Sequence, residues 1–247
     1  MKRILCGVHA VREALSANPR ALASIFVDAD IPQHGPLSEI AVRARAEKVS
    51  VEVVDTASLD AFAKGLRHQG VVAVSAGDYP YVSVEEVTHA ARAHGRGGLI
   101  VALDEVTDPH NLGAIVRSAV ALGADGVLTL KDRAAPITAA AVRASAGATE
   151  HAKVARVTNL ARTLSSLTDD GWTAVGLAAE APGALSSLDL SGDVVLVVGS
   201  EGKGLRRLVR ERCTSLGRIP LAGPLASLNA SVAAAVALYE VVRQRGG

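Results

Sequence analysis

The sequence predicts an α/β protein in which a small α/β unit is followed by a larger domain built on a parallel sheet. Helix-like and strand-like segments alternate along the 247 residues, which is typical of α/β folds. From residue 99 onward the strand segments are almost continuously apolar, as strands are when helices cover both faces of a parallel sheet. We therefore expect a first domain over 1–77, a linker over 78–98 and a second domain over 99–247.

The first domain shows helical and extended patterns in regular succession. Its strand segments are rich in Val and Ile and end at Gly or polar residues, whereas its helical segments carry apolar residues three and four apart. We expect helices over 7–17, 37–48 and 57–66 and strands over 24–29, 49–55 and 70–76. The linker, 78–98, contains Gly, Pro and two tyrosines and has no strand pattern, so we interpret it as a connection with a short helix.

The second domain repeats the order strand, helix, strand. A helix opens at "DPHNLGAIVRSA" directly after the apolar strand "LIVALD", and a long Ala/Val-rich helix closes the chain. We expect strands over 99–104, 126–130, 152–157, 172–178, 194–199 and 216–221, and helices over 108–121, 136–148, 159–170, 204–213 and 227–245.

Composition excludes several classes of protein. Hydrophobic residues make up 49% of the chain and the formal net charge is +1, which is not the profile of a disordered or histone-like basic chain. Cys6 and Cys213 lie far apart without a CxxC, and the seven histidines lack the spacing of a metal site. No secretory signal and no apolar run long enough for a membrane span are found, so we expect a soluble cytoplasmic protein without metal.

Three stretches break the packing pattern, and each follows a predicted strand, where ligands gather in open α/β sheets. In the first, Asp108 and Pro109 resemble a helix cap and first helical residue, and Asn111, Gly113 and Arg117 follow within two turns. Taken alone, Asn111 could be a cap and Arg117 a solvated side chain. His110, Ala114, Arg117 and Ala121 share the helix edge beside the buried face.

The second stretch, "VVGSEGKGL" at residues 197–205, has three glycines in six residues. It lacks the Lys-Ser/Thr of a Walker loop and does not follow the dinucleotide-binding spacing. Glu201 would repel phosphates but suits a cation or a hydroxyl; a tight turn with a solvated Glu is the structural alternative. In the third stretch a Pro/Gly loop, "IPLAGP", leads to Ser227, Asn229 and Ser231, which are more polar groups than one helix cap needs.

In order and spacing, these three stretches resemble the motifs of the SpoU branch of the SPOUT methyltransferases. The shared residues are Asn111, Gly113 and Arg117, then Gly199, Glu201 and Gly202, and finally Ser227, Leu228 and Asn229. Ala230 departs from the Val that is common after the last motif. "GVHAVREAL" and "HQGVVA" resemble the family's small RNA-binding domain, which is similar to ribosomal protein L30e. The resemblance covers nearly the whole chain, and within the family it is strongest to the 23S rRNA guanosine-2′-O-methyltransferases, which modify the P-site loop of that RNA.

The resemblance implies a fold in which the C-terminal segment forms a trefoil knot, and an enzyme that acts as a homodimer through the knot domain. It also implies S-adenosylmethionine as cofactor, bound largely through the backbone of Gly199, Ile219 and Leu228, with Pro220 and Leu221 nearby. The expected reaction is methylation of a ribose 2′-hydroxyl in RNA, for which Arg117, Asn111, Glu201 and Asn229 are the candidate catalytic residues.

The role of Arg117 stays open between two routes. The family assigns activation of the hydroxyl to this residue, but the pKa of a guanidinium ordinarily exceeds about 12, so a neutral arginine is costly. Arg117 either accepts the proton or holds the adjacent phosphate while that phosphate or a water accepts it. Candidate RNA-contacting residues elsewhere are Arg67, His68, Lys131, Arg133, Arg143, Arg206, Arg207 and Arg210.

Two further classes of function remain as alternatives. One is methylation of another rRNA or tRNA nucleotide, including methylation that confers antibiotic resistance. The other is a non-catalytic RNA-binding factor for ribosome assembly, which the intact set of candidate catalytic residues disfavours.

Overall fold

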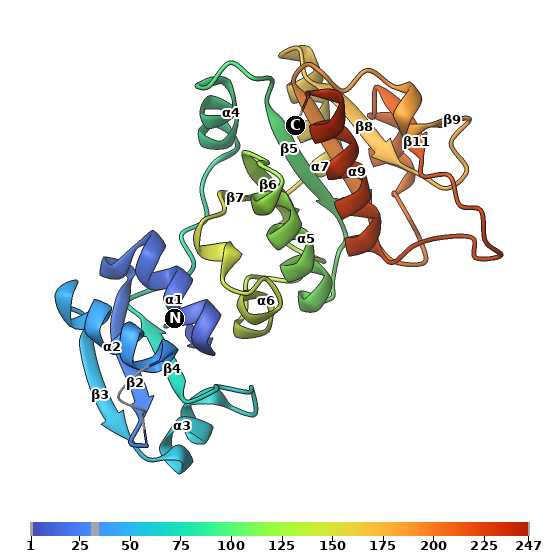
Figure 1. The fold of residues 1–247 in the computed structure, drawn as a ribbon. Helices are drawn as coiled ribbons and strands as arrows, with labels where there is room; N and C mark the ends of the chain where they lie inside the picture. Colours follow the sequence, from blue (N-terminus) through green and yellow to red (C-terminus); the bar gives the residue numbers. More distant parts are fainter. Residues whose placement is uncertain (1, 31–34, 247) are drawn as a thin grey trace. The chain divides into compact units, whose positions relative to one another are not determined.

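The computed structural model describes residues 2–30 and 35–246, and contacts within this part of the chain divide it into two compact units (Figure 1). The N-terminal unit comprises the chain up to Pro80 together with Pro136–His151. The C-terminal unit comprises Tyr81–Ala135 and the chain from Ala152 onward. The sequence prediction places 136–148 in the second domain, whereas its contacts group it with the first. No helix among the described residues has the length and apolar character that crossing a bilayer requires.

The N-terminal unit is a mixed sheet with helices packed on it. The sheet order is β1-β4-β2-β3; β1 and β2 run antiparallel to β4, and β2 runs parallel to β3. The strand β1 was not predicted, because three residues are too few to show a period. The strands are β1 (Ile4–Cys6), β2 (Leu22–Asp28), β3 (Ser50–Val54) and β4 (Val71–Ser75), and the helices are α1 (Val8–Ala17), η1 (Pro19–Ala21, 3-10), α2 (Pro36–Ala46) and α3 (Thr56–Ala63).

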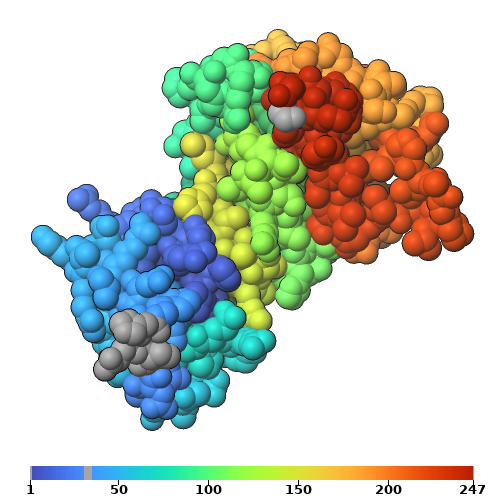
Figure 2. All heavy atoms as spheres, in the orientation of Figure 1, coloured from blue at the N-terminus to red at the C-terminus, as the bar shows by residue number. Residues whose placement is uncertain are grey.

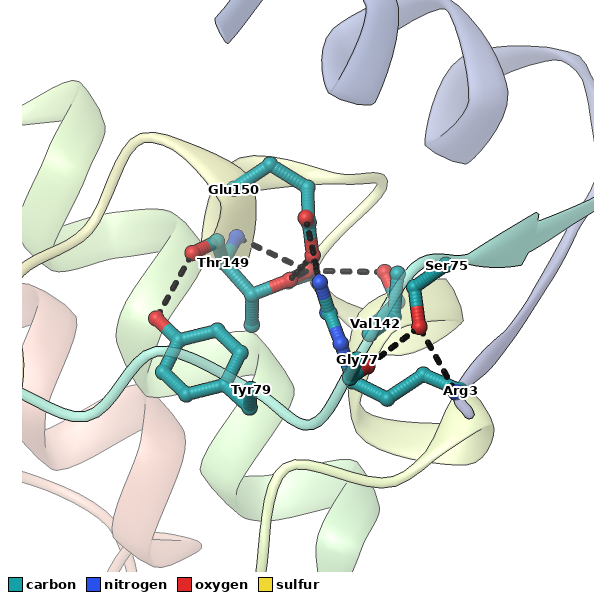
Figure 3. A network of polar contacts seen from close by, with 8 residues as sticks. Arg3, Ser75, Gly77, Tyr79, Val142, Thr149 and Glu150 are labelled. Atoms are coloured by element: carbon teal, nitrogen blue, oxygen red, sulfur yellow. Dashed lines mark hydrogen bonds and ion pairs between the residues drawn. The ribbon is translucent and has the colours of Figure 1, made fainter. Parts of the chain in front are cut away.

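The segment 136–151 forms α6 (Ala139–Ala144) and the 3-10 helix η2 (Ala148–Glu150), which a buried polar network holds in the N-terminal unit (Figure 3). Both terminal nitrogens of Arg3 bind the Glu150 carboxylate, at 2.8 and 3.1 Å. These side chains are only 9% and 8% exposed. The Tyr79 hydroxyl donates to the carbonyl of Thr149 at 2.8 Å. These contacts explain why residues 136–151 belong to the N-terminal unit, although the sequence prediction places 136–148 in the second domain.

The C-terminal unit contains a seven-stranded sheet of order β7-β6-β5-β10-β8-β11-β9 in which every described pairing is parallel, as predicted. Each residue of β5, β6 and β10 is buried, in line with the unbroken apolar sequence of these strands. The strands are β5 (Leu99–Asp104), β6 (Gly126–Leu130), β7 (Val154–Val157), β8 (Thr173–Leu177), β9 (Gly183–Ala184), β10 (Val194–Gly199) and β11 (Ser215–Arg218).

Helices cover both faces of this sheet. On one face α4, α7 and α8 share a core with alternate strand residues such as Ile100 and Ala102. The intervening residues Val101 and Leu103 are fully buried and face the other side, where α5 and α9 lie side by side (Figure 1). The helices are α4 (Val84–Arg92), α5 (Pro109–Ala121), α7 (Leu160–Asp169), α8 (Arg207–Glu211), α9 (Ala230–Gln244) and the 3-10 helix η3 (Leu185–Ser187).

The predicted linker contains the short helix that the sequence indicates, namely α4. The helix begins with a reciprocal capping box between Ser83 and Glu86, and it buries Val87 and Ala91 in the core of the C-terminal unit. The latter part of 78–98 is therefore packed as an integral element of that unit. The functional division into 1–77 and 99–247 stays a prediction.

Candidate active site

The three motif stretches follow β5, β10 and β11, so they all lie beyond the carboxyl edge of the same parallel sheet. The first begins α5 as expected: the Asp108 side chain accepts a hydrogen bond from the backbone N–H of His110 at 2.9 Å, and Pro109 occupies the first helical position. Since Asp108 is the cap, Asn111 is free of that role. It is the third residue of α5, and it is 8% exposed.

Asn111, Glu201 and Asn229 come together in one hydrogen-bonded cluster, although 118 residues separate the first from the last. The Asn111 amide Nδ2 donates to Glu201 Oε2 at 3.1 Å. The Asn229 amide Nδ2 donates to Asn111 Oδ1 at 3.0 Å and lies 3.4 Å from Glu201 Oε2. We call these three residues the polar trio. The structure thus joins one predicted catalytic residue from each motif.

Asn229 also caps the closing helix. Its Oδ1 accepts hydrogen bonds from the backbone N–H and the hydroxyl of Ser231, at 2.9 and 2.6 Å. The two ends of one amide therefore have separate tasks: the oxygen fixes the start of α9, and the nitrogen binds Asn111 and Glu201. A cap alone needs only the oxygen, so the nitrogen of Asn229 can bind the other two residues of the polar trio.

Glu201 lies in a short closed loop, and the structure explains why glycine is needed at several of its positions. Ser200 and Gly204 exchange two backbone hydrogen bonds, at 3.2 and 2.9 Å, and so close the loop around Glu201. A Cβ at Gly199 would lie 2.2 Å from the carbonyl carbon of Gly204, so no side chain fits there. Gly202 and Gly204 have φ of 79° and 64°, a region that strongly favours glycine.

Arg117 lies outside the polar trio. It is exposed on α5, on the same edge as the exposed residues His110 and Ala121, as the helical spacing predicts. No hydrogen bond or ion pair to Arg117 is found within residues 2–30 and 35–246. Six residues of helix separate it from Asn111, which turns its side chain about 240° around the axis. The structure therefore does not bring Arg117 to the other three candidates within the described chain.

The residues expected at the cofactor flank the end of β8. Gly199 is the last residue of β10, and Ile219 follows β11, on the other side of β8 in the sheet order. Pro220 and Leu221 are exposed, and Leu228 is half-buried just before α9. Across the described chain, no hydrogen bond involves residues 219–228. The backbone donors and acceptors of this loop are consequently available to a ligand.

The structure also shows a charge network that the sequence did not reveal. Asp104, fully buried at the end of β5, accepts hydrogen bonds from the backbone N–H and the Nε of Arg206, at 2.8 and 2.7 Å. Glu105 lies 3.3 Å from Arg206 and 3.0 Å from Arg133. Glu105 and Arg133 both have positive φ, 57° and 59°. An acid at the end of an otherwise apolar strand was the only signal in the sequence.

Two of the other candidates for RNA contact, His68 and Arg210, have partners in the chain. His68 lies 3.1 Å from Asp60 and accepts from the backbone N–H of Gly70, and Arg210 pairs with Glu180.

Burial raises the pKa of Cys6 to about 11 and that of Cys213 to about 12, so neither thiol is a nucleophile at neutral pH. The described residues contain no grouping of three or more His, Cys, Asp or Glu side chains that could hold a metal ion.

Known proteins resemble this chain over both of its parts. The family model described as SpoU rRNA Methylase matches residues 98–239. The model described as RNA 2′-O ribose methyltransferase substrate binding matches residues 4–80.

Individual relatives align along almost the whole chain. A tRNA/rRNA methyltransferase of Mycobacterium sp. (strain KMS) is 45% identical over 98% of this chain and 76% of its own length. The 23S rRNA (guanosine-2′-O-)-methyltransferase RlmB of Xanthomonas campestris pv. campestris is 42% identical over 98% of this chain and 97% of its own. A solved structure, the AdoMet-bound rRNA methyltransferase from Sinorhizobium meliloti, has a TM-score of 0.79 at 25% identity and covers 98% of this chain and 87% of its own. The chain belongs to the SpoU rRNA methylase family of RNA 2′-O-ribose methyltransferases.

Proposed function

We propose that this protein transfers a methyl group from S-adenosylmethionine to the ribose 2′-hydroxyl of a guanosine in 23S rRNA. The observation that carries this proposal is the polar trio, which joins one residue of each family motif in a single hydrogen-bonded cluster. The 42% identity to the Xanthomonas 23S rRNA enzyme over nearly all of both chains supports the choice of RNA. The substrate-binding family match over residues 4–80 supports a role for the N-terminal unit in holding that RNA.

The donor groups at the carboxyl edge fit S-adenosylmethionine. A neutral heterocycle such as adenine pairs well with backbone N–H and C=O groups, and the loop 219–228 has these groups without partners in the described chain. The carboxylate of Glu201 is exposed just beyond the end of β10 and suits a cationic ligand, since opposite charges attract. When bound, the cofactor supplies a methyl group activated by a sulfonium centre. Gly199, Ile219 and Leu228, with Pro220 and Leu221, are the residues we assign to hold it.

The protein's own contribution is positioning and proton removal. Alignment of a hydroxyl with an activated methyl group can supply a large part of a rate enhancement, because the reacting atoms meet without further loss of entropy. We assign the polar trio to orient the ribose and the methionine end of the cofactor. We assign Arg117 to hold the phosphate beside the target ribose, because a guanidinium stays protonated at neutral pH. Formation of the bond between the 2′-oxygen and the methyl carbon would break the bond between that carbon and sulfur, and the cofactor would leave as a neutral thioether. The hydroxyl proton would pass to that phosphate or to water.

A homodimer through the C-terminal unit is part of the proposal. The outer side of α9 carries an exposed apolar stripe at helical spacing: Val232, Val236 and Tyr239 are 47%, 40% and 60% exposed. Leu225, in the loop before α9, is 73% exposed. In Figure 2 the C-terminal part of the chain, coloured red, lies at the surface. Such a stripe is costly in water and is covered when two copies associate. The C-terminal trefoil knot, which the family resemblance implies, and a cytoplasmic location belong to the same proposal.

Mapping of 2′-O-methyl groups on 23S rRNA, with and without the gene, tests the target. We expect one guanosine to lose its methylation in the deletion strain and to regain it on complementation. Loss of a methyl group elsewhere in rRNA, or in tRNA mapped from the same cells, would replace the proposed target. The tRNA alternative is included because the Mycobacterium relative is named a tRNA/rRNA methyltransferase. No change at any nucleotide would favour a non-catalytic assembly factor.

A further inference from the structure

A hollow lies at the carboxyl edge of the sheet, and none of the polar trio lines it. It has a volume of about 320 Å³. Its walls are formed by the segments that follow β6, β7 and β10. Its lining residues are Arg133, Thr158, Asn159, Ala161, Arg206, Arg207, Leu208 and Val209. We call it the arginine pocket. Its size is near the lower end of ligand cavities, which span about 300–1,000 Å³, and so suits a group no larger than one nucleotide.

The charges of the arginine pocket favour an anion. Three of its eight lining residues are arginines, and none is acidic. The carboxylates that pair with these arginines lie outside the lining. Asp104 is fully buried behind Arg206, Glu105 pairs with both Arg133 and Arg206, and Glu211 is one turn further along α8. The side chains of Arg133 and Arg207 are 68% and 77% exposed, so both can turn to a ligand. A guanidinium binds phosphate oxygens through two parallel hydrogen bonds.

Another part of the lining is apolar. Leu208 is 56% exposed although its neighbour Val209 belongs to the core, and Ala161 is half-buried beside them. An inorganic phosphate has no apolar surface that could pack against an exposed leucine. A nucleotide, in contrast, presents a ribose and the face of a base together with its phosphate. A pocket that combines arginines with an apolar side therefore matches the groups of a nucleotide within an RNA strand.

The arginine pocket is connected to the polar trio through one loop. Arg206 follows Glu201 by five residues, and Asp104 ties Arg206 to the end of β5, from which the Asn111 segment departs. We infer that the arginine pocket binds a nucleotide next to the methylated one, with its phosphate on Arg133 and Arg207 and its sugar or base against Leu208. This inference rests on the proposed function, because it needs an RNA strand at the polar trio.

Binding of in vitro transcribed 23S rRNA to the full-length protein, measured between 50 and 200 mM KCl, tests the inference. Loss of one phosphate contact weakens binding and lowers the slope of log Kd against log salt by about 1. We expect Arg133→Ala and Arg207→Ala each to raise Kd several-fold with that change of slope. In methyl transfer they should raise KM for RNA and leave kcat and S-adenosylmethionine affinity within twofold. Arg212→Ala is the matched control, since Arg212 is exposed just beyond α8 but does not line the pocket.

Glu211→Gln separates a phosphate contact from a structural role of the Arg207–Glu211 pair, which measures 2.7 Å. If Arg207 binds phosphate, removal of its competing carboxylate leaves RNA binding equal or tighter. Weakening equal to that of Arg207→Ala would overturn the inference, as would pocket variants that bind RNA like Arg212→Ala. A wild-type protein that binds the transcript but methylates no RNA would overturn the proposed function instead, and the binding comparison would still decide the pocket.

Discussion

The carboxylate of Asp104 holds Arg206 through both its backbone and its side chain, and this contact joins the end of β5 to the loop that presents Glu201. One oxygen accepts from the Arg206 backbone N–H at 2.8 Å, and the other accepts from Nε and lies 2.7 Å from Nη2. Asp104 is fully buried, whereas the Arg206 side chain is 32% exposed. The two partners therefore differ in what their loss leaves behind.

Arg206→Ala should destabilise the C-terminal unit more than Asp104→Asn. The first variant leaves a buried carboxylate with a backbone hydrogen bond but without its opposite charge, and removal of one partner of a buried ion pair costs about 3–5 kcal/mol. The second leaves an arginine that can turn to water, at a cost of about 1–3 kcal/mol. Urea unfolding followed by the fluorescence of Trp172, the single tryptophan, reports on this unit because Trp172 lies in its core. Equal midpoints for the two variants would contradict the ranking.

Arg117→Ala should abolish most methyl transfer without loss of cofactor binding. Removal of a group that contacts the reacting region typically lowers kcat by about 10²–10³, and Arg117 has no partner in the described chain whose loss would disturb the fold. We expect S-adenosylmethionine affinity, measured by calorimetry, to stay within several-fold of wild type. Full activity in this variant would remove Arg117 from the mechanism.

Gly199→Ala should distort the Glu201 loop. The added Cβ would meet the backbone of Gly204 at 2.2 Å, and backbone cannot move aside as a flexible side chain can. Overpacking of this kind costs about 1–3 kcal/mol or more, which the Trp172 unfolding transition would show. Gly223→Ala serves as control, because nothing lies within 4 Å of its Cβ position. A stability of Gly199→Ala equal to that of the control would refute the steric argument.

Val236→Glu should convert the proposed dimer to a monomer. A carboxylate in the middle of the apolar stripe on α9 would be buried without a partner if two copies associated there. Light scattering after size exclusion, at micromolar concentration, measures the mass directly. Val53→Glu is the control, since Val53 is 58% exposed on β3 of the N-terminal unit. A monomeric wild type, or a dimer that survives Val236→Glu, would rule out association through this face.

Glu150→Ala should loosen 136–151 from the N-terminal unit. Arg3 would keep a nearly buried charge without its carboxylate, and removal of one partner of a buried pair costs about 3–5 kcal/mol. Hydrogen exchange should accelerate in β1 and α6. The exposed pair Arg207–Glu211 gives the comparison, because Glu211→Ala should cost less than about 1 kcal/mol. Unchanged exchange in the Glu150 variant would show that apolar packing alone holds the segment.

Much of the fold was predictable because its signals are local. Apolar runs such as Leu99–Asp104 and Val194–Gly199 match buried parallel strands, and the start of α5 has the predicted cap. The strand β1 was missed because three residues carry no period. The place of 136–151 was also missed, since the Arg3–Glu150 pair spans 147 residues. No local pattern can report such a contact.

The sequence by itself determined the two-part α/β organisation, the family motifs and the residue types of the site. Periodicity and turn chemistry act over a few residues, so they can be read along the chain. Only the tertiary structure decided that Asn111, Glu201 and Asn229 form one cluster, that Arg117 stays outside it within the described chain, and that Asp104 holds Arg206. These are long-range contacts, and their partners are chosen by the way the parallel strands bring their carboxyl ends to one edge.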